Sequence, residues 1–458
     1  MSTEFASLPL KPELLQALAS LSYERMTPIQ ALSLPPMLEG RDVIGQARTG
    51  TGKTAAYALA LLSRIDPALK RVQALVLCPT RELADQVAKE IRRLARCSPN
   101  IKLTVLSGGI SKRPQLASLE HDPHIVVGMA GRVQELLDDG SLKLDALKVL
   151  VLDEADRMLG ADFEEATRTI VAQAPSTRQT LLFSATMPDA VRVAARRLQK
   201  QAFEATADAA GTIPEIIQAF YHVTPERRLD ALAHILSVER PESALVFCHT
   251  REDVEGVEAG LRERGFSVLA LHGWVDQRQR EEVLVRFANG SCRVMVATDI
   301  AARGLDIKGL AAVLSYELPK DPEAHLHRIG RTGRAGLAGH AWHLVSPHER
   351  ERLRAIGEHL SIAPNEQRLP GEFLPDRPLP ASFATLCIDA GRSDKLRPGD
   401  LLGALTGDAG LQKEAVGKIN TFDTRTYVAI EKKLAPLALQ RLSAGKIKGR
   451  KFRVRMIG

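Results

Sequence analysis

The segment from Ala47 to Thr54 contains the residue types that bind phosphate groups. It reads Ala-Arg-Thr-Gly-Thr-Gly-Lys-Thr and stands between a short strand-like stretch and a helical one. Gly50 and Gly52 allow backbone N–H groups to close around phosphate oxygens, and the positive end of the following helix faces them. Lys53 is placed to neutralise charge on the β- and γ-phosphates, and Thr54 to ligate Mg²⁺. The segment therefore predicts a nucleoside triphosphate site, although Ala47 replaces the first glycine of the general pattern.

A pair of carboxylates follows an apolar, strand-like run about 100 residues later. Asp153, at the predicted end of the strand, is suited to hold Mg²⁺ through its water shell. Glu154 stands where it could orient and deprotonate an attacking water. An isolated acidic turn is usually a helix cap or a solvated loop, but a preceding phosphate loop favours nucleotide hydrolysis.

Short apolar runs alternate with amphipathic helical stretches from residue 40 to about 350. The predicted strands lie at 74–80, 101–108, 124–129, 147–156 and 180–186 in a first series and at 243–249, 267–273, 291–299 and 310–317 in a second. Nearly continuous apolar strands with helices between them predict parallel sheets that are covered on both faces. Because two such series do not fit one sheet comfortably, we predict two α/β domains.

Two segments are predicted to be linkers. The first, at about 202–223, lacks a strong apolar period and carries Gly211 and Pro214; the second, at 368–382, contains four prolines. A shorter pattern of strands and helices follows, which predicts a small α+β domain. We expect domains at 1–208, 209–367 and 381–458, with the Pro-rich linker at 368–380.

The composition is that of an ordinary globular protein. The chain has 458 residues, of which 45% are hydrophobic and 26% charged. No stretch approaches the length of a membrane span, and the N-terminus lacks a signal-peptide pattern, so we expect a cytoplasmic protein without a membrane partner. Five widely spaced cysteines, without a C-x-x-C pair, are expected to be reduced thiols.

The positive charge is concentrated at the C-terminal end. Residues 381–458 contain 15 Lys and Arg against 7 Asp and Glu, which gives +8, whereas the whole chain has a net charge of +7. The first 380 residues therefore carry a net charge of −1. This distribution predicts that the last segment binds a polyanion.

The residues Asp153-Glu154-Ala155-Asp156 spell the signature of the DEAD-box RNA helicases, and residues 1–365 resemble that family. Further motifs resemble the family in the expected order: Thr27-Pro28-Ile29-Gln30 with Phe5 upstream, Pro79-Thr80-Arg81-Glu82-Leu83, Gly108-Gly109, Ser184-Ala185-Thr186, the run from Ala297 to Asp306, and the run from His327 to Arg334. The resemblance implies an ATP-dependent RNA helicase, an ATP hydrolase with two tandem RecA-like parallel-sheet domains.

The resemblance also assigns roles around ATP. Gln30 would hydrogen-bond the adenine, Asp306 would touch the ribose, and His327 would link the nucleotide to Ser184 and Thr186. The second predicted sheet has no phosphate loop, so its contribution would come from Arg331 and Arg334, acting as arginine fingers on the γ-phosphate. The residues expected to bind ATP are Phe5, Gln30, Ala47, Arg48, Thr49, Gly50, Thr51, Gly52, Lys53, Thr54 and Asp306, with Thr54 and Asp153 also at Mg²⁺.

RNA is the partner that the family binds, mainly through its backbone. By resemblance, the contacts are Thr80, Arg81, Gly108, Gly109 and Arg132 on the first domain and Gln277, Arg280 and Thr298 on the second. Two positions depart from the family pattern. Met129-Ala130 replaces the usual Thr-Pro before Gly131-Arg132, which predicts weaker distortion of a duplex, and Ser22 replaces a glycine.

The C-terminal segment resembles an RNA-recognition motif of the DbpA subfamily, whose members bind a hairpin of 23S rRNA. Its strand-like runs at 385–392 and 426–433 have the spacing of the two central strands, but Tyr427 is their only aromatic residue, so conventional base stacking is doubtful. A basic strip is the expected alternative: Lys446, Lys448, Arg450, Lys451, Arg453 and Arg455.

We therefore expect a monomeric helicase that unwinds short RNA duplexes during large-subunit assembly. An RNA clamp switched by ATP, without productive unwinding, is the alternative that the Met129-Ala130 departure keeps open. A DNA translocase is disfavoured by the combination of the Asp-Glu-Ala-Asp and adenine-reading motifs, so no DNA partner is expected.

Overall fold

The computed structural model describes residues 3–48, 50–207, 216–302, 309–333, 339–360, 363–369, 378–408 and 410–457. The chain divides into two compact units, the first holding the described residues up to 207 and the second those from 216 onward. Three sites of the sequence prediction, Thr49, Asp306 and Arg334, lie outside the described residues.

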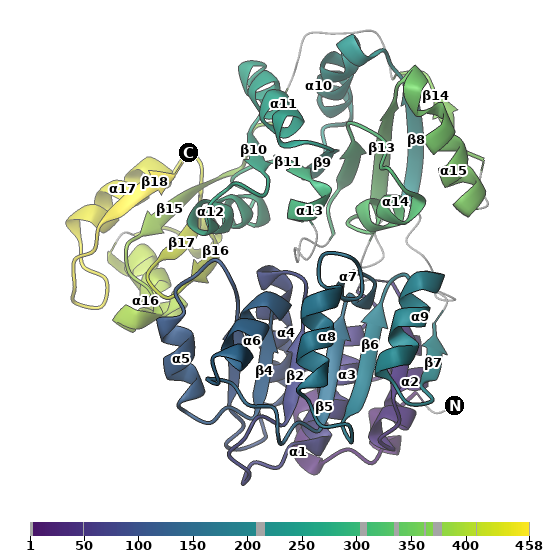
Figure 1. Cartoon of the computed structure of the whole chain (residues 1–458). Helices are drawn as coiled ribbons and strands as arrows, with labels where there is room; N and C mark the ends of the chain where they lie inside the picture. The colour runs from purple at the N-terminus through teal and green to yellow at the C-terminus, as the bar shows by residue number, and fades with distance from the viewer. Residues whose placement is uncertain are drawn as a thin grey trace. The chain divides into compact units, whose positions relative to one another are not determined.

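The first unit contains a parallel sheet with the strand order β3-β4-β2-β5-β6-β1-β7. Its strands are β1 (Val43–Gln46), β2 (Ala74–Leu77), β3 (Leu103–Leu106), β4 (Ile125–Gly128), β5 (Val149–Asp153), β6 (Gln179–Ser184) and β7 (Phe203–Thr206). Its helices are α1 (Pro12–Ser20), α2 (Pro28–Leu38), α3 (Lys53–Arg64), α4 (Arg81–Leu94), α5 (Arg113–Leu119), α6 (Ala130–Asp138), α7 (Ala155–Met158), α8 (Glu164–Ala172) and α9 (Asp189–Leu198). Figure 1 shows helices on both faces of the sheet.

Alternate residues of each strand enter different cores in this unit. On β5, Val149 and Val151 pack in a cluster with α1 to α4, whereas Leu150 and Leu152 pack in a second cluster with α6, α8 and α9. A strand with both faces buried must be apolar at successive positions, which is why its sequence shows no alternation. The predicted parallel sheet with two covered faces is thus confirmed.

The second unit begins with another parallel sheet, in the order β10-β11-β9-β12-β13-β8-β14. Its strands are β8 (Ile216–His222), β9 (Ala244–Cys248), β10 (Val268–Leu271), β11 (Val294–Thr298), β12 (Ala312–Ser315), β13 (Gly339–Val345) and β14 (Glu366–Gln367). The helices are α10 (Arg228–Glu239), α11 (Arg251–Glu263), α12 (Gln277–Ala288), α13 (Asp299–Ala302), α14 (Pro322–Ile329) and α15 (Arg350–Leu360). Both RecA-like sheets are therefore present.

One expectation about the chain between the sheets was wrong in detail. The segment 202–223 was expected to be a linker, but β7 and β8 lie within it and complete their respective sheets. Both strands are short or partly exposed, so their sequences carry only a weak apolar pattern.

The C-terminal end of the second unit folds into an antiparallel sheet with the order β16-β17-β15-β18. Its elements are β15 (Phe383–Ile388), α16 (Pro398–Gly403), β16 (Val416–Thr421), β17 (Thr426–Glu431), α17 (Ala435–Ala444) and β18 (Val454–Ile457). Leu386, Ile388 and Val428 pack on one face against residues of α16 and α17. The predicted small α+β domain is confirmed.

Candidate active site and RNA-binding surfaces

The phosphate loop leaves β1 and enters α3 at Lys53. Gly50 and Gly52 have φ angles of 85° and 92°, in the left-handed region that glycine adopts most readily. The Lys53 ammonium is buried and donates a hydrogen bond to the Ala47 carbonyl oxygen at 2.7 Å. Lys53 therefore closes the loop on itself, with its positive charge inside the turn.

Gln30 ties the start of α2 to this loop. Its amide oxygen accepts from the Thr27 N–H at 2.9 Å, and its amide nitrogen donates to the Gly52 carbonyl at 3.1 Å. A Cβ at Gly52 would lie 2.4 Å from the Gln30 amide nitrogen, so a side chain there would displace the Gln30 amide as well as strain the backbone at φ 92°. Phe5, in the short helix Phe5–Ser7, is buried and meets Tyr23 edge to face. Gln30 therefore lies beside the loop, and its predicted recognition of adenine stays a prediction.

Asp153 is the last residue of β5 and is buried beside α3. Its carboxylate accepts hydrogen bonds from the Tyr57 hydroxyl at 2.7 Å and from the Glu154 N–H at 3.0 Å. Burial raises the pKa of the Asp153 carboxyl above its usual value, while nearby Lys53 and the two donors oppose the rise. A cation at this carboxylate would relieve the cost of burying its charge.

Glu154 has an unusual backbone conformation. Its φ and ψ angles are 49° and 56°, a left-handed conformation that residues other than glycine rarely adopt. It lies immediately after Asp153, where β5 ends and α7 begins. Such local strain is common at functional sites, so this conformation makes Glu154 a candidate functional residue.

Ser184 and Thr186 join β6 to the same edge. The Ser184 carbonyl accepts from the Ala47 N–H at 3.1 Å, and the Ser184 hydroxyl oxygen accepts from the Thr186 N–H at 3.3 Å. The Thr186 hydroxyl donates to the Asp156 carboxylate at 2.8 Å. The motif after β6 is therefore bonded both to the phosphate loop and to the acidic motif after β5. His327 lies on α14 of the other unit, so its predicted link to them stays a prediction.

The predicted RNA residues of the first unit follow the other half of this sheet edge. Thr80 follows β2 and caps α4, accepting from the Leu83 N–H at 3.3 Å, and Arg81 begins that helix. Gly108 and Gly109 follow β3, and a Cβ at either would meet nothing within 4 Å. Since β3, β4 and β2 are neighbours and parallel, their carboxyl ends form one continuous edge.

Arg132 lies in α6, after β4, at that edge. It forms an ion pair with Glu135 at 2.9 Å and donates to the Ile110 carbonyl at 3.2 Å. Met129, where the family usually has threonine, is the N-cap of α6 and supplies no side-chain hydrogen bond to the helix. The start of α6 thus lacks the cap that a threonine would offer.

The second unit brings its predicted residues to the carboxyl edge of its own sheet. Gln277 begins α12, and Arg280 of the same helix donates to the Ala301 carbonyl at 2.8 Å. The Thr298 hydroxyl oxygen, at the end of β11, accepts from the Ala301 N–H at 3.3 Å. The start of α12 and the end of β11 are therefore held together.

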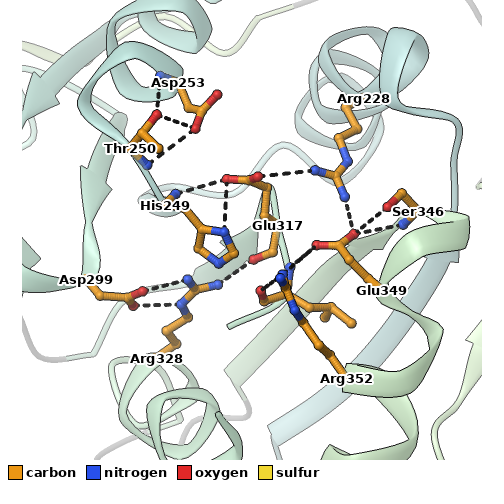
Figure 2. Close-up of polar contacts among 11 residues, drawn as sticks. Arg228, His249, Thr250, Asp253, Asp299, Glu317, Arg328, Ser346, Glu349 and Arg352 are labelled. Carbon is orange, nitrogen blue, oxygen red and sulfur yellow. Dashed lines mark hydrogen bonds and ion pairs between the residues drawn. The ribbon is translucent and has the colours of Figure 1, made fainter. Parts of the chain in front are cut away.

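Arg331 follows α14, whose position is set by Arg328, a buried residue for which no role was predicted. Figure 2 shows the Arg328 guanidinium against both oxygens of Asp299, each at 2.7 Å. It also donates to the Glu317 carbonyl at 2.6 Å. These bonds join α14, and so Arg331, to the chain after β11 and β12.

The Glu317 side chain continues this buried network. It accepts from the His249 N–H at 3.0 Å and lies 3.7 Å from the Arg228 guanidinium. Arg228 also pairs with Glu349, which accepts from the backbone N–H groups of Leu318 and Ser346 at 2.9 Å (Figure 2). The charged residues of this network are far apart in sequence. No local pattern could therefore have predicted that they bond to one another.

The C-terminal sheet uses its second face for packing, because that face contacts α12. Tyr427 and Cys387 form an apolar cluster with Val285 of that helix, and Tyr427 is only 1% exposed. Beside it, the Thr385 hydroxyl oxygen accepts from the Asn289 amide at 3.0 Å and donates to the Ser291 hydroxyl at 2.8 Å. The doubt about conventional stacking on this sheet was therefore justified, since the face is covered.

The predicted basic strip is exposed except at one residue. Lys446, Lys448, Arg450, Lys451 and Arg453 are exposed. Lys448 lies 3.4 Å from Asp400 and Arg450 3.6 Å from Asp394, whereas Arg455 turns toward Glu282 of α12 at 3.9 Å. Arg455 therefore belongs to the interface with α12.

Among the described residues, no helix is both long and apolar enough to cross a lipid bilayer.

Comparison with protein families gives three consecutive matches. Residues 27–193 match the DEAD/DEAH box helicase family, residues 227–336 the helicase conserved C-terminal domain, and residues 385–456 the DbpA RNA binding domain. Each match falls on a different one of the three sheets.

Two relatives and one solved structure extend the comparison. The ATP-dependent RNA helicase DbpA of Escherichia coli is 49% identical, covering 99% of this chain and all of the relative. The DEAD-box ATP-dependent RNA helicase CshA of Bacillus cereus is 42% identical over 77% of this chain and 67% of its own length. Dbp5 of S. cerevisiae bound to RNA and ADP BeF3 has a TM-score of 0.74 at 28% identity, covering 81% of this chain and 96% of Dbp5. The chain therefore belongs to the DEAD-box ATP-dependent RNA helicases, as a DbpA-like member with a DbpA-type RNA-binding domain.

Proposed function

We propose that this RNA helicase separates short RNA duplexes during assembly of the large ribosomal subunit, directed to a hairpin of 23S rRNA by its C-terminal domain. The main support is the DbpA RNA binding domain match at 385–456 together with the exposed basic strip. Since the sheet face is covered, the strip is the surface of this domain best suited to bind the phosphates of a structured RNA.

The bonds around the phosphate loop support its proposed role with ATP. Lys53 would exchange its bond to Ala47 for the β- and γ-phosphates, while the helix start and the glycines hold the remaining oxygens. Gln30 would read adenine, because its amide oxygen and nitrogen each retain capacity for a second hydrogen bond. Phe5 would pack against the base, and Asp306 would contact the ribose.

Asp153 and Thr54 fit a Mg²⁺ ion, because a carboxylate and a hydroxyl are the hard oxygen donors that this cation prefers. The buried Asp153 carboxylate, whose pKa burial raises, gains from a cation nearby. When bound, Mg²⁺ would supply charge neutralisation at the phosphates. Glu154, held in its left-handed conformation, would orient and deprotonate the attacking water.

The second domain would complete the ATP site when the two domains close. Arg331 and Arg334 would stabilise the charge that develops on the γ-phosphate, and His327 would connect this arrangement to Ser184 and Thr186. The bonds of Arg328 to Asp299 support this role for Arg331, since they fix the helix that precedes it. ATP hydrolysis would then depend on the RNA that holds both domains together.

RNA would lie along the two sheet edges that carry the predicted contacts. Thr80, Arg81, Gly108, Gly109 and Arg132 would bind its backbone on the first domain. Gln277, Arg280 and Thr298 would do so on the second. The open space at both glycines supports close approach of a phosphate to their N–H groups.

An ATP-switched clamp without unwinding is the second candidate. The uncapped start of α6 at Met129 favours it, because a less firmly held helix would bend a duplex less strongly.

We also propose the domain limits 1–208, 209–367, 368–380 and 381–458, a monomeric state, a cytoplasmic location, and preference for RNA over DNA.

Strand displacement tests the proposal. The substrate is a short RNA duplex joined to the 23S rRNA hairpin, compared with the same duplex joined to an unrelated hairpin and with a DNA duplex. We expect ATP-dependent release of the strand from the first substrate, with ATP hydrolysis stimulated most by the same RNA. Tight binding in ATP without strand release would favour the clamp, and equal release from both hairpins would exclude the proposed rRNA address.

A further inference from the structure

Trp274 is the most exposed large hydrophobic side chain among the described residues, at 81%. It lies in the turn between β10 and α12, three residues before Gln277. Burial of an aromatic ring is usually favourable, so a ring left in water at this position would gain from a partner that covers it.

Polar contacts hold the chain behind the Trp274 ring. The Arg251 guanidinium lies over the ring, 5.1 Å from its centre. Glu255 accepts a hydrogen bond from Arg251 at 2.7 Å and lies 3.3 Å from His272. The His272 ring accepts from the backbone N–H of Trp274 at 3.4 Å. The ring therefore has a cation over it that is itself bonded to Glu255, and most of its surface is open to solvent.

The position of Trp274 relates it to the proposed RNA contacts. Because β10 and β11 pair in parallel, the turn after β10 and Thr298 at the end of β11 lie at the same edge of the sheet. Asp276 caps α12 by accepting from the Gln279 N–H at 2.9 Å, which fixes the short connection from Trp274 to Gln277. Ile300, also at this edge, is 67% exposed. The sheet edge thus combines the side chains that we propose to contact RNA with exposed apolar surface.

We propose that Trp274 is a base-stacking site for one unpaired nucleotide of the RNA strand that passes along the second RecA-like domain. The inference rests on the proposed RNA contacts of Gln277 and Arg280. Every nucleobase offers a flat π-face, and an aromatic ring beside bound phosphates is the arrangement that single-strand binding proteins use. Arg251 would hold the ring in place and add positive charge close to the strand.

Stacking on Trp274 would give the helicase core a preference among bases that backbone contacts cannot supply. Purines offer a larger π-face than pyrimidines, so a purine at the stacked position should bind more tightly. A phosphate contact, by contrast, would be indifferent to the base.

Fluorescence of the full chain tests this assignment directly. The protein contains two tryptophans, and the other, Trp342, is buried in the second domain. A single-stranded RNA decamer is titrated in saturating ADP and beryllium fluoride. We expect quenching of the wild-type emission as RNA binds and an unchanged emission in Trp274→Phe, which retains only Trp342. Absence of quenching in a wild type that binds the decamer would overturn the proposal.

Affinity measurements separate stacking from other contacts of the ring. Trp274→Ala should weaken binding of the decamer about 5- to 100-fold, and Trp274→Phe much less, since a phenyl ring still stacks. A series of decamers carries one abasic site, each at a different position. Wild-type affinity should fall only when the abasic site replaces the stacked base. For Trp274→Ala, the same abasic site should cause no further loss of affinity. Two results would contradict stacking: an equal loss of affinity at the abasic site for both proteins, or an unchanged affinity of Trp274→Ala for the intact decamer. Either result would favour a protein partner as the group that covers the exposed ring.

Arg280→Ala distinguishes this failure from failure of the proposed RNA contacts. Suppose that Arg280→Ala loses RNA-stimulated ATP hydrolysis but Trp274→Ala keeps wild-type affinity for RNA. This result would refute the stacking site and leave the proposed RNA contacts intact. Wild-type behaviour of both variants would refute the RNA contacts as well. Far-UV circular dichroism should be the same for each variant and the wild type, since Trp274 contributes little to the core.

Discussion

The Tyr57 hydroxyl of α3 donates a hydrogen bond to the Asp153 carboxylate of β5 at 2.7 Å, inside the first domain. Both side chains are buried, so no water replaces the bond if either partner is removed. The helix that begins at the phosphate loop is thereby joined to the strand that ends in the acidic motif.

Tyr57→Phe should lower the free energy of unfolding of the first domain by about 1–3 kcal/mol, because a buried carboxylate loses a donor. The loss should be smaller with Mg²⁺ and ATP present, since a cation compensates the same carboxylate. Urea unfolding with and without the ligands measures both effects. Tyr23→Phe is the matched control, because it removes a hydroxyl bonded to Glu90 and keeps the ring that packs against Phe5; an equal ligand dependence in both variants would contradict the proposed Mg²⁺ position.

Glu154→Gln should bind ATP with nearly wild-type affinity and hydrolyse it at least about 100-fold more slowly, because an amide cannot accept the proton of the attacking water. Fluorescent nucleotide binding and RNA-stimulated phosphate release measure the two quantities. Glu164→Gln, an exposed change at the start of α8, should leave both unchanged. A hydrolysis rate close to that of the wild type would remove Glu154 from its proposed role.

Neutralising the basic strip should weaken binding of the rRNA hairpin and flatten its dependence on salt. In Lys451→Gln/Arg453→Gln, the slope of log K against log salt should fall by about 2 in magnitude if each residue contacts one phosphate. Lys432→Gln/Lys433→Gln removes the same charge from exposed positions after β17. Equal slopes for the two double variants would show that only net charge matters.

Thr385→Val should loosen the interface between the C-terminal sheet and α12, because Asn289 and Ser291 lose a buried partner. Hydrogen exchange should then accelerate in both β15 and α12. Thr426→Val removes a buried hydroxyl bonded to the Ala390 carbonyl, which lies inside the C-terminal domain. Its effect should stay within that domain, and faster exchange of α12 in both variants would argue against a specific interface contact.

Two buried histidines of the second domain should make its stability depend on pH. Burial, and then Arg328, lowers the pKa of His325 to about 4, and burial lowers that of His343 well below its usual value. Between pH 6.5 and about 4 the unfolded chain therefore binds more protons, so stability falls as the solution is acidified. His325→Gln should reduce this slope by up to about 1.4 kcal/mol per pH unit, as measured by urea unfolding at several pH values. His359→Gln, at an exposed position, should leave the slope unchanged; an unaltered slope in His325→Gln would show that this histidine does not titrate on unfolding.

Much of the fold was predictable because parallel strands with two buried faces must be apolar at successive positions. That pattern located β2 to β6 and β9 to β12. β7 and β8 escaped notice because edge or partly exposed strands need fewer apolar residues, and Gly211 and Pro214 between them suggested a linker. Within the first unit, Gln30 bonds Gly52 of the phosphate loop and Lys53 lies near Asp153, while the binding of ATP and Mg²⁺ by these residues stays a prediction.

The contacts that were missed depend on pairs far apart in sequence. Nothing local marks Arg328 as the partner of Asp299, or Glu349 as the partner of Arg228, because the charges meet only after the second sheet forms. The basic strip was visible as composition, but the burial of Tyr427 and the turn of Arg455 toward α12 follow from docking, which the sequence does not display.

Docking of the C-terminal sheet also limits how this helicase can change its target over evolutionary time. Substitutions at Thr385, Cys387 or Tyr427 would loosen the docked domain before they altered any RNA preference. The loop between α17 and β18 exposes the basic side chains from Lys446 to Arg453, so these side chains should tolerate exchange. A change of RNA specificity should therefore arise from substitutions in that loop, while the face packed against α12 stays unchanged.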